Sequence, residues 1–391
     1  MQILENEQLI YLDNNASTPC APEAVEAMLP YLLTNYANSA SSHLMGRRAI
    51  LAVQHAREQI ACAVGATANE IVLTSGATES NNMTIFGLAS DMNRRTRIVS
   101  SVIEHKSVLG PLNRLEAKGF DITLLPVSAS GSIDVDEAAS VIDENTLLVT
   151  IQAANNEIGS LQPVQEIGRI ARKCGAFMHS DASQLLGKIP FTVDEMGVDL
   201  ASFSAHKVYG PKGVGCLFIR DNVKRYLKPI LYGGGQESKL RPGTVNVPAA
   251  IGFGVACQLV TGSISDEADR VEKLRDFAEE ILKELPDLSI NGLEGRRLPG
   301  TISVTLHSIP ADMLIARLPA VCIGTGSACT SGAVSPSHVI TALGHTIDEA
   351  RSTVRISIGR YNNEEEVRFA AKAIVNEASQ IRNSLSGSAL V

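Results

Sequence analysis

Short apolar runs alternate with amphipathic stretches between about residue 70 and residue 220. Six runs predict strands: residues 97–105, 121–127, 146–154, 176–183, 199–207 and 215–220. Several of them are apolar nearly throughout, which is typical of strands covered on both faces. The stretches between them have helical spacing, and the one at 164–175 ends on Gly175, as helices often do. Because strands and helices alternate, we expect an α/β fold with a mostly parallel sheet.

The pattern changes after about residue 257. Residues 265–287 predict a helix with one apolar face, formed by Val271, Leu274, Ala278, Ile281 and Leu285. Residues 300–309 and 353–361 alternate like half-exposed antiparallel strands. A last helix is expected over residues 362–385, where Asn363 and Glu366 are spaced as a capping box.

This change predicts two domains. The large one covers residues 18–257, and a smaller α+β domain combines residues 1–17 with residues 258–391. A length of 391 residues is ample for two cores.

Composition and charge exclude several classes of protein. The net charge of −8 argues against a direct nucleic-acid binder, which would show a basic face. No apolar run reaches the roughly 18 residues of a membrane helix, and the acidic N-terminus lacks the basic start of a signal peptide. Seven cysteines without a C-x-x-C pair indicate free thiols in a reducing cytoplasm.

Two strand ends carry candidate catalytic chemistry. Lys207, in "SAHKVYGPKG", follows a buried run, where a desolvated amine of lowered pKa can form a Schiff base with an aldehyde cofactor. Taken alone, Lys207 is better explained as an exposed lysine at the end of a strand. Asp181 ends the preceding strand, and an acid there suits the pyridine nitrogen of pyridoxal phosphate. Ligands of open α/β sheets gather at this edge.

Three further motifs follow predicted strands. The stretch "TSGATESNN" (74–82) reads as a phosphate cradle at a helix start, or simply as a capped helix. His105 could stack on the cofactor ring and shuttle protons, or be a structural histidine. Asn155 and Asn156 are turn formers or ligands of a substrate carboxylate.

The smaller domain contributes two more candidates. Arg355, within a strand, could hold a carboxylate bidentately or form a surface ion pair. Cys329 lies in "IGTGSACTSG" (323–332), among small residues that suit a thiol nucleophile on a flexible loop. No histidine or cysteine spacing fits a metal site, and no G-x-S-x-G supports a hydrolase.

Taken together, the motifs resemble those of the cysteine desulfurases, pyridoxal-phosphate enzymes of the aminotransferase class V type. The resemblance runs from "YLDNNASTP" (11–19) to "SIGRYNNEEE" (357–366). Its most specific pieces are "SGATESNN", "ANNEIG", "HSDASQ", "SAHKVYGPKGVG", "RPGTVNVPAAIGFG" and "GSACTSG". It implies a fold-type I homodimer with a seven-stranded sheet and active sites near the dimer interface.

The resemblance also implies residue roles. Lys207 would bond to the cofactor aldehyde, Asp181 would contact the pyridinium nitrogen, Gln184 the phenolic oxygen, and His105 would stack on the ring. The phosphate end would be formed by Ala77, Thr78, Ser204 and His206, with Thr244 supplied by the second subunit. Asn156 would contact both the cofactor and, with Arg355, the substrate carboxylate.

The implied reaction takes sulfur from L-cysteine, leaves L-alanine and forms a persulfide on Cys329. The loop at about 323–337 resembles the group with a long, mobile cysteine loop, so we expect poor order at roughly 327–337. The sulfur acceptor would be a protein serving iron–sulfur assembly, tRNA thiolation or DNA phosphorothioation, and the sequence does not choose among them.

Two alternatives remain open at this point. Another class V enzyme, such as an aminotransferase or selenocysteine lyase, would share the cofactor but would not need Cys329. A cofactor-binding regulator or scaffold would have little reason to keep Lys207, Asp181 and Cys329 together.

Overall fold

The computed structural model describes residues 9–90, 95–325 and 336–388. Its larger sheet has seven strands in the order β2-β8-β7-β6-β5-β3-β4. The strands are β2 (Ile71–Thr74), β3 (Arg97–Ser101), β4 (Asp121–Leu125), β5 (Thr146–Thr150), β6 (Phe177–Asp181), β7 (Leu200–Ser204) and β8 (Gly215–Ile219). All neighbouring pairs are parallel except the two made by β8. The predicted mostly parallel, seven-stranded sheet is therefore confirmed.

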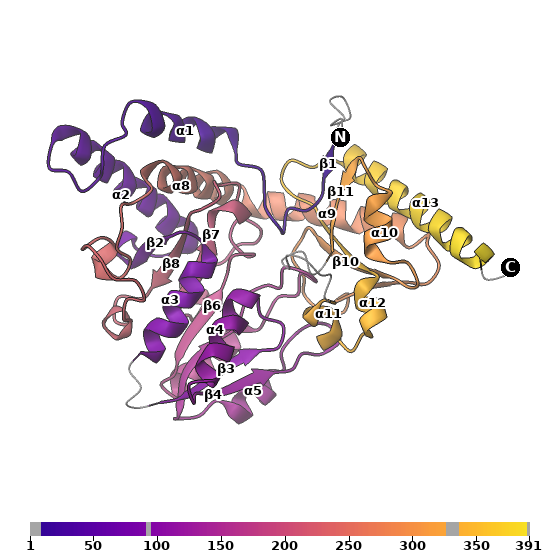
Figure 1. Cartoon of the computed structure of the whole chain (residues 1–391), viewed down its shortest axis with the longest axis horizontal. Coiled ribbons are helices and arrows are strands. Elements are labelled where there is room, and N and C mark those ends of the chain that lie inside the picture. The colour runs from indigo at the N-terminus through magenta and orange to yellow at the C-terminus, as the bar shows by residue number, and fades with distance from the viewer. Residues whose placement is uncertain (1–8, 91–94, 326–335, 389–391) are drawn as a thin grey trace.

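Helices cover both faces of this sheet, which explains why apolar residues of its strands point to both sides (Figure 1). Along β2, Ile71 and Leu73 enter one core and Val72 enters the other. The first core also takes residues of α1 (Pro22–Leu33), α2 (Leu44–Val64), α5 (Val135–Val141), α6 (Val164–Lys173), α7 (Val193–Met196) and α8 (Val247–Thr261). The second takes residues of α3 (Ala77–Ala89) and α4 (Lys106–Glu116).

The smaller sheet is antiparallel, with the order β12-β13-β10-β9. Its strands are β9 (Leu288–Ile290), β10 (Thr301–Leu306), β12 (Gly324–Thr325) and β13 (Thr353–Ser357). A parallel pair of β1 (Ile10–Tyr11) and β11 (Val321–Cys322) joins the N-terminal segment to this half. The remaining helices are α9 (Ile264–Leu282), α10 (Ala311–Ala316), α11 (His338–Ala342), α12 (Ile347–Arg351) and α13 (Glu364–Ser388).

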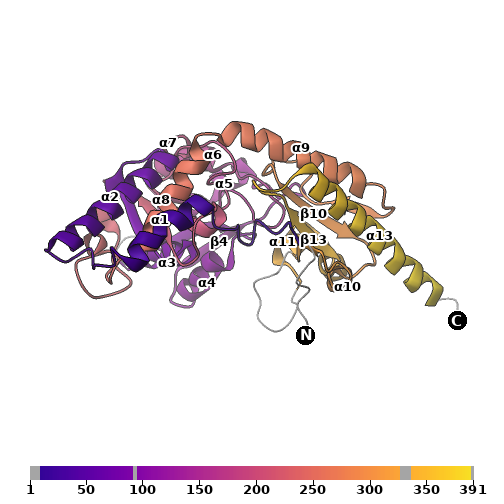
Figure 2. The same cartoon turned by 90° about the horizontal axis from the view of Figure 1, so that it is seen from above.

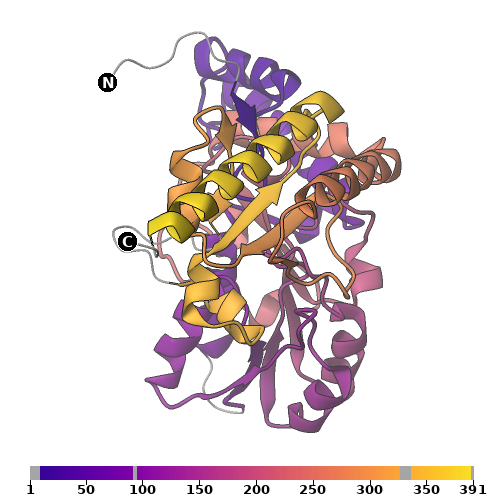
Figure 3. The same cartoon turned by 90° about the vertical axis from the view of Figure 1, so that its right-hand side faces the viewer.

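The long helix α9 leads from α8 to the smaller sheet (Figure 2). The five predicted core positions are all buried, which confirms the apolar face, although α9 ends at Leu282 and Leu285 follows it. Helix α13 lies across the outer side of the smaller sheet (Figure 3). The capping box at its start is also confirmed, because Glu366 N donates to Asn363 Oδ1 at 3.0 Å and Asn363 N to Glu366 Oε2 at 3.3 Å.

One core of the smaller half contains Ile10 and Leu12 together with residues from Val271 to Ile381. We propose that the two halves are the domains expected from the sequence, 18–257 and 1–17 with 258–391. Within the described ranges no single helix is long and apolar enough to cross a membrane; α8 and α9 meet that criterion only as a pair bent by 77°.

The eight predicted strands all end one to four residues earlier than expected, and two of them show why. The strand expected at 353–361 stops at Ser357, because Gly359 N turns to bond Asn362 Oδ1 at 2.8 Å. A Cβ on Gly359 would lie 2.5 Å from Asn14 Cγ, so the chain there packs closely against the N-terminal segment. The strand expected at 199–207 stops at Ser204, and residues Ala205–Lys207 form a 3-10 turn.

Candidate active site

The candidate site lies at the carboxyl ends of the parallel strands, as predicted. Strand β6 ends on Asp181, and the loops after β3 and β5 carry His105 and Asn156. Strand β7 leads through its 3-10 turn to Lys207. Strand β2 runs in the same direction as β7, because both pair antiparallel to β8, so it delivers the start of α3 to this edge.

Lys207 is partly buried and directed at the N-terminal segment. Its Nζ donates to the carbonyl oxygens of Asn15, at 2.5 Å, and Ala16, at 2.7 Å. These contacts hold the amine beside residues that the sequence places almost two hundred positions away. The structure therefore brings the predicted Schiff-base lysine next to the "YLDNNASTP" motif.

Asp181 and His105 are linked through two residues that the sequence analysis did not select. Asn81 Nδ2 donates to Asp181 Oδ2 at 2.7 Å and to Ser107 Oγ at 2.8 Å. Ser107 Oγ lies 2.7 Å from His105 Nδ1, and Ser107 N donates to the same ring nitrogen at 3.1 Å. The neutral tautomer of His105 therefore carries its proton on Nε2.

Burial sets the charge of the two histidines. Desolvation lowers the pKa of His105, an effect that Asp181 opposes and Lys207 reinforces. Desolvation, with Lys207 and Lys212, lowers the pKa of His206 to about 4. Both rings are therefore neutral at pH 7 and can donate or accept hydrogen bonds without adding positive charge.

The expected phosphate cradle lies at the start of α3. Its N-cap, Gly76, has φ of +150° and supplies no side-chain cap for the first-turn N–H groups, which include those of Ala77 and Thr78. Ser204 Oγ would lie 3.6 Å from a Cβ on Gly76, which places this hydroxyl beside the same turn. A helix start of this kind suits a phosphate dianion.

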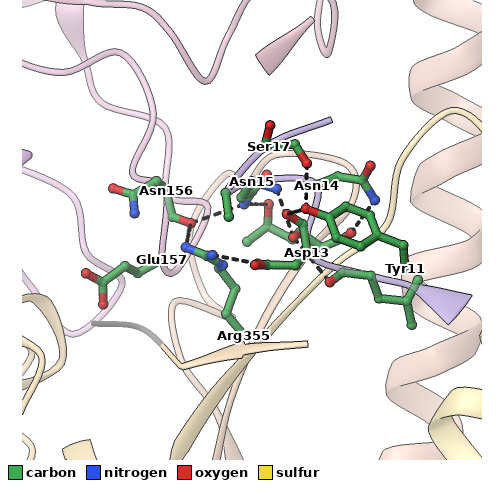
Figure 4. A network of polar contacts seen from close by, with 12 residues as sticks. Tyr11, Asp13, Asn14, Asn15, Ser17, Asn156, Glu157 and Arg355 are labelled. Carbon is green, nitrogen blue, oxygen red and sulfur yellow. Dashed lines mark hydrogen bonds and ion pairs between the residues drawn. The ribbon is translucent and has the colours of Figure 1, made fainter. Parts of the chain in front are cut away.

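Arg355 extends from β13 toward the large sheet (Figure 4). Its Nη2 pairs with Asp13 Oδ1 at 2.6 Å, and Nη1 donates to Asn156 O at 3.2 Å. The residue is 3% exposed, so the ion pair is buried rather than on the surface. Its Nε is buried and makes no hydrogen bond to any described residue. The buried Nε–H is therefore one donor that is suited to contact a substrate carboxylate.

Asn15 contacts several of the predicted residues, and Figure 4 shows it beside Asn156. Its carbonyl accepts from Gln184 Nε2 at 2.9 Å as well as from Lys207. Its side-chain Nδ2 donates to Asn156 O at 3.2 Å and to Thr301 Oγ1 at 2.9 Å. The side chain of Asn15 thus connects the loop after β5 of the large sheet with β10 of the smaller sheet.

Cys329 and most of the loop expected to be poorly ordered fall outside the described residues. Both flanks are described. Gly324 pairs with Arg355 across β12 and β13. After the gap, Ser337 Oγ donates to the buried carboxylate of Glu157 at 2.5 Å and caps α11 through Val339 N and Ile340 N.

The residues of this edge fit the expected cofactor. The uncapped start of α3 and Ser204 are suited to hold a phosphate, Asp181 is a buried carboxylate that accepts from the Asn81 amide, and Lys207 supplies an amine. Thr244 is exposed in the single chain.

No group of three or more His, Cys, Asp or Glu side chains in the described ranges is placed to hold a metal ion.

Several site residues were missed: Asp13, Asn15, Asn81, Ser107, Glu157, Lys188 and Ser337. Most lie inside motifs already quoted, such as "YLDNNASTP", "SGATESNN" and "ANNEIG". The motifs therefore marked the right segments, but which side chain meets which partner depends on the fold.

Comparison with known proteins agrees with this site. The aminotransferase class-V model matches residues 10–369. Cysteine desulfurase IscS of Rickettsia typhi is 40% identical over 385 residues, which cover 97% of this chain and 94% of that protein. Two solved structures are also similar. A NifS-like protein has a TM-score of 0.88 and 38% identity, covering 95% of this chain and 99% of its own. The structure of SspA in complex with cysteine has a TM-score of 0.81 and 39% identity, and the match covers 90% of this chain and 99% of SspA.

The chain therefore belongs to the class V aminotransferase family of fold-type I enzymes. Within that family its relatives are cysteine desulfurases, so the resemblance predicted from the motifs is confirmed. This family depends on pyridoxal 5′-phosphate, which confirms the implied cofactor.

Proposed function

We propose that this protein is a cysteine desulfurase that converts L-cysteine to L-alanine and stores the sulfur as a persulfide on Cys329. The Cys329 thiolate attacks the substrate sulfur, an S–S bond forms, and the substrate C–S bond breaks. The electron pair of that bond stays with the substrate carbon, which takes up a proton to become the methyl group of alanine. Bound pyridoxal phosphate supplies the electron sink that makes this carbon able to release sulfur.

The main support for this role of Cys329 is that the residues on both sides of its segment are held at the site. Gly324 lies opposite Arg355, and Ser337 bonds Glu157, the neighbour of Asn156. Cys329 follows Thr325 by four residues, which span at most about 14 Å of chain. A thiol tied to the carboxylate-binding arginine by so short a tether suits attack on a substrate that Arg355 holds.

The side chains have distinct proposed tasks. Arg355 and Asn156 hold the substrate carboxylate, and Asp181 keeps the pyridine nitrogen protonated. Lys207 bonds the cofactor and, with His105, moves protons at the substrate. A neutral His105 with its proton on Nε2 can donate that proton, and its contact with Ser107 keeps the ring in one orientation.

We propose that the active form is a homodimer. Five apolar residues of α1 and the following loop are exposed at helical spacing: Val25, Leu29, Leu32, Leu33 and Tyr36. The exposed Thr244 would then complete the phosphate cradle of the partner. The sulfur acceptor is proposed to be a protein, because a persulfide is passed by contact, and a thiol carrier needs a reducing compartment such as the cytoplasm.

The test is the mass of the Cys329 peptide after L-cysteine is added without reductant, with alanine measured in parallel. The proposal expects one added sulfur atom on that peptide and alanine in equal amount, and Cys329→Ser should abolish both. Full turnover by Cys329→Ser would instead indicate a class V lyase or aminotransferase. A protein that binds the cofactor but leaves cysteine unchanged would indicate a regulator or scaffold.

A further inference from the structure

A second lysine lies inside the candidate site and has no task in the proposed reaction. Lys188 follows Gln184 by four residues in "HSDASQLLGKIP" and is only partly exposed. Its Nζ donates to Gln184 Oε1 at 2.5 Å and to Asn15 Oδ1 at 2.7 Å. Both acceptor residues also lie beside Lys207, because Asn15 O accepts from Lys207 Nζ and from Gln184 Nε2.

These two contacts determine how both amides point. The amide atoms that face Lys188 are oxygens, because Asn15 Oδ1 and Gln184 Oε1 accept the hydrogens of its Nζ. The NH₂ group of Gln184 is therefore on the other side, where Nε2 donates to Asn15 O, the same oxygen that accepts from Lys207 Nζ. The second hydrogen of Nε2 has no partner among the described residues, which leaves it available to a ligand beside Lys207.

The charges around Lys188 explain why an amine suits this position. No carboxylate of the described residues lies within ion-pair distance of its Nζ, and Lys207 and Arg355 are its charged neighbours. Burial and these two cations lower the pKa of Lys188 well below its usual value. A neutral amine has two hydrogens, which match its two amide acceptors, and it adds no positive charge next to Lys207.

We infer that Lys188 is a positioning residue of the cofactor site, which orients Gln184 so that its N–H faces the phenolic oxygen of the cofactor. The inference rests on the proposed function, since it assigns Gln184 to that oxygen. Without Lys188, the Oε1 of Gln184 and the Oδ1 of Asn15 lose their donor, and the Gln184 amide can turn its oxygen toward the cofactor. A phenolic oxygen that loses a donor holds negative charge less readily.

The experiment compares Lys188→Met with Gln184→Leu and with the double variant, each loaded with pyridoxal phosphate and without cysteine. The readouts are the cofactor Kd and the pH midpoint of the change in visible absorption. Lys188→Met should raise Kd about tenfold and move the midpoint upward by about one pH unit, the scale of one lost hydrogen bond. The double variant should match Gln184→Leu within about twofold, because Lys188 acts through Gln184.

Controls separate positioning from a general loss of structure. Lys173→Met, on an exposed helix position, should leave both readouts unchanged. Lys188→Gln keeps an N–H donor and should move the midpoint less than Lys188→Met. Equal shifts in these two variants, additive effects in the double variant, or a lower melting temperature with an unmoved midpoint would overturn the inference. Wild-type protein that binds no pyridoxal phosphate would instead refute the proposed function.

Discussion

The side chains of Asn81 and Asp181 are joined by a hydrogen bond of 2.7 Å, from Nδ2 to Oδ2. Asn81 lies in α3 and Asp181 ends β6, so this contact fixes α3 against β6. It joins the helix whose start is the proposed phosphate cradle to the proposed partner of the pyridine nitrogen. Asn81 is fully buried, and its Nδ2 also donates to Ser107 Oγ. The Asn81 amide thus fixes the positions of α3, Asp181 and Ser107, the partner of His105, relative to one another.

Replacement of Asn81 by Leu should weaken cofactor binding. Asp181 and Ser107 would both lose a buried donor, at a cost of about 1–3 kcal/mol for each unsatisfied group. We expect the Kd of pyridoxal phosphate, measured by titration of the apoprotein, to rise at least tenfold. The matched control is Asn82→Leu, because the Asn82 amide bonds only the carbonyl of Thr78 in its own helix. Equal Kd values for the two variants would contradict this role of Asn81.

The Asn81 contact also shows what the sequence could and could not predict. Apolar strand runs that alternate with helical stretches predicted the covered parallel sheet, and order along the chain placed Lys207, Asp181, His105 and Asn156 at one edge. These predictions depend on local pattern, which the sequence contains. Asn81 and Asp181 are a hundred positions apart, and only the packing of α3 on the sheet brings them together. The same holds for Lys188 and Asn15, whose contact needs the N-terminal segment to cross the site.

Replacement of Arg355 by Lys should impair substrate binding more than the chemical step. Arg355 uses two separate nitrogens of its planar guanidinium for Asn156 O and Asp13, which leaves Nε for the substrate. Lysine has its donors on a single nitrogen and cannot reproduce this fork. We expect KM for L-cysteine to rise about ten- to a hundredfold, which corresponds to about 1.5–3 kcal/mol for a hydrogen bond to a charged group. Steady-state kinetics check this. Arg351→Lys, an exposed arginine on α12, is the control and should leave KM unchanged. An unchanged KM in Arg355→Lys would remove Arg355 from the carboxylate site.

A charge on the exposed face of α1 should break the proposed homodimer. Leu29 is 46% exposed in the single chain and lies within the apolar stripe of this helix. Leu29→Glu would bury an unpaired carboxylate in the interface, and we expect sedimentation velocity to show monomer in place of dimer. Cofactor affinity should fall with it, since Thr244 of the partner would be lost. Leu293→Glu, at 49% exposure in the smaller half, is the control. A wild-type monomer, or a dimeric Leu29→Glu variant, would refute this interface.

The carboxyl group of Glu104 should make stability depend on pH. Burial raises its pKa from 4.5 to about 8, with Asp181 adding to the effect, while its Oε1 accepts from Ser101 Oγ and Gln152 N. Below about pH 4.5 the folded and unfolded chains both hold the proton. Between there and about pH 8 only the folded chain does, so the free energy of unfolding falls as the pH rises.

Glu104→Gln keeps the shape of the protonated acid without its titration. Between pH 5 and 8 the wild type should therefore lose more than about 1 kcal/mol of unfolding free energy relative to Glu104→Gln, since one pKa unit corresponds to about 1.4 kcal/mol. Urea unfolding at several pH values measures the difference, and any slope from Glu157, whose pKa burial raises to about 7, is common to both proteins. Glu116→Gln, at an exposed position of α4, should follow the wild-type slope. If Glu104→Gln follows it too, Glu104 is already ionised in the folded protein and the buried site tolerates its charge.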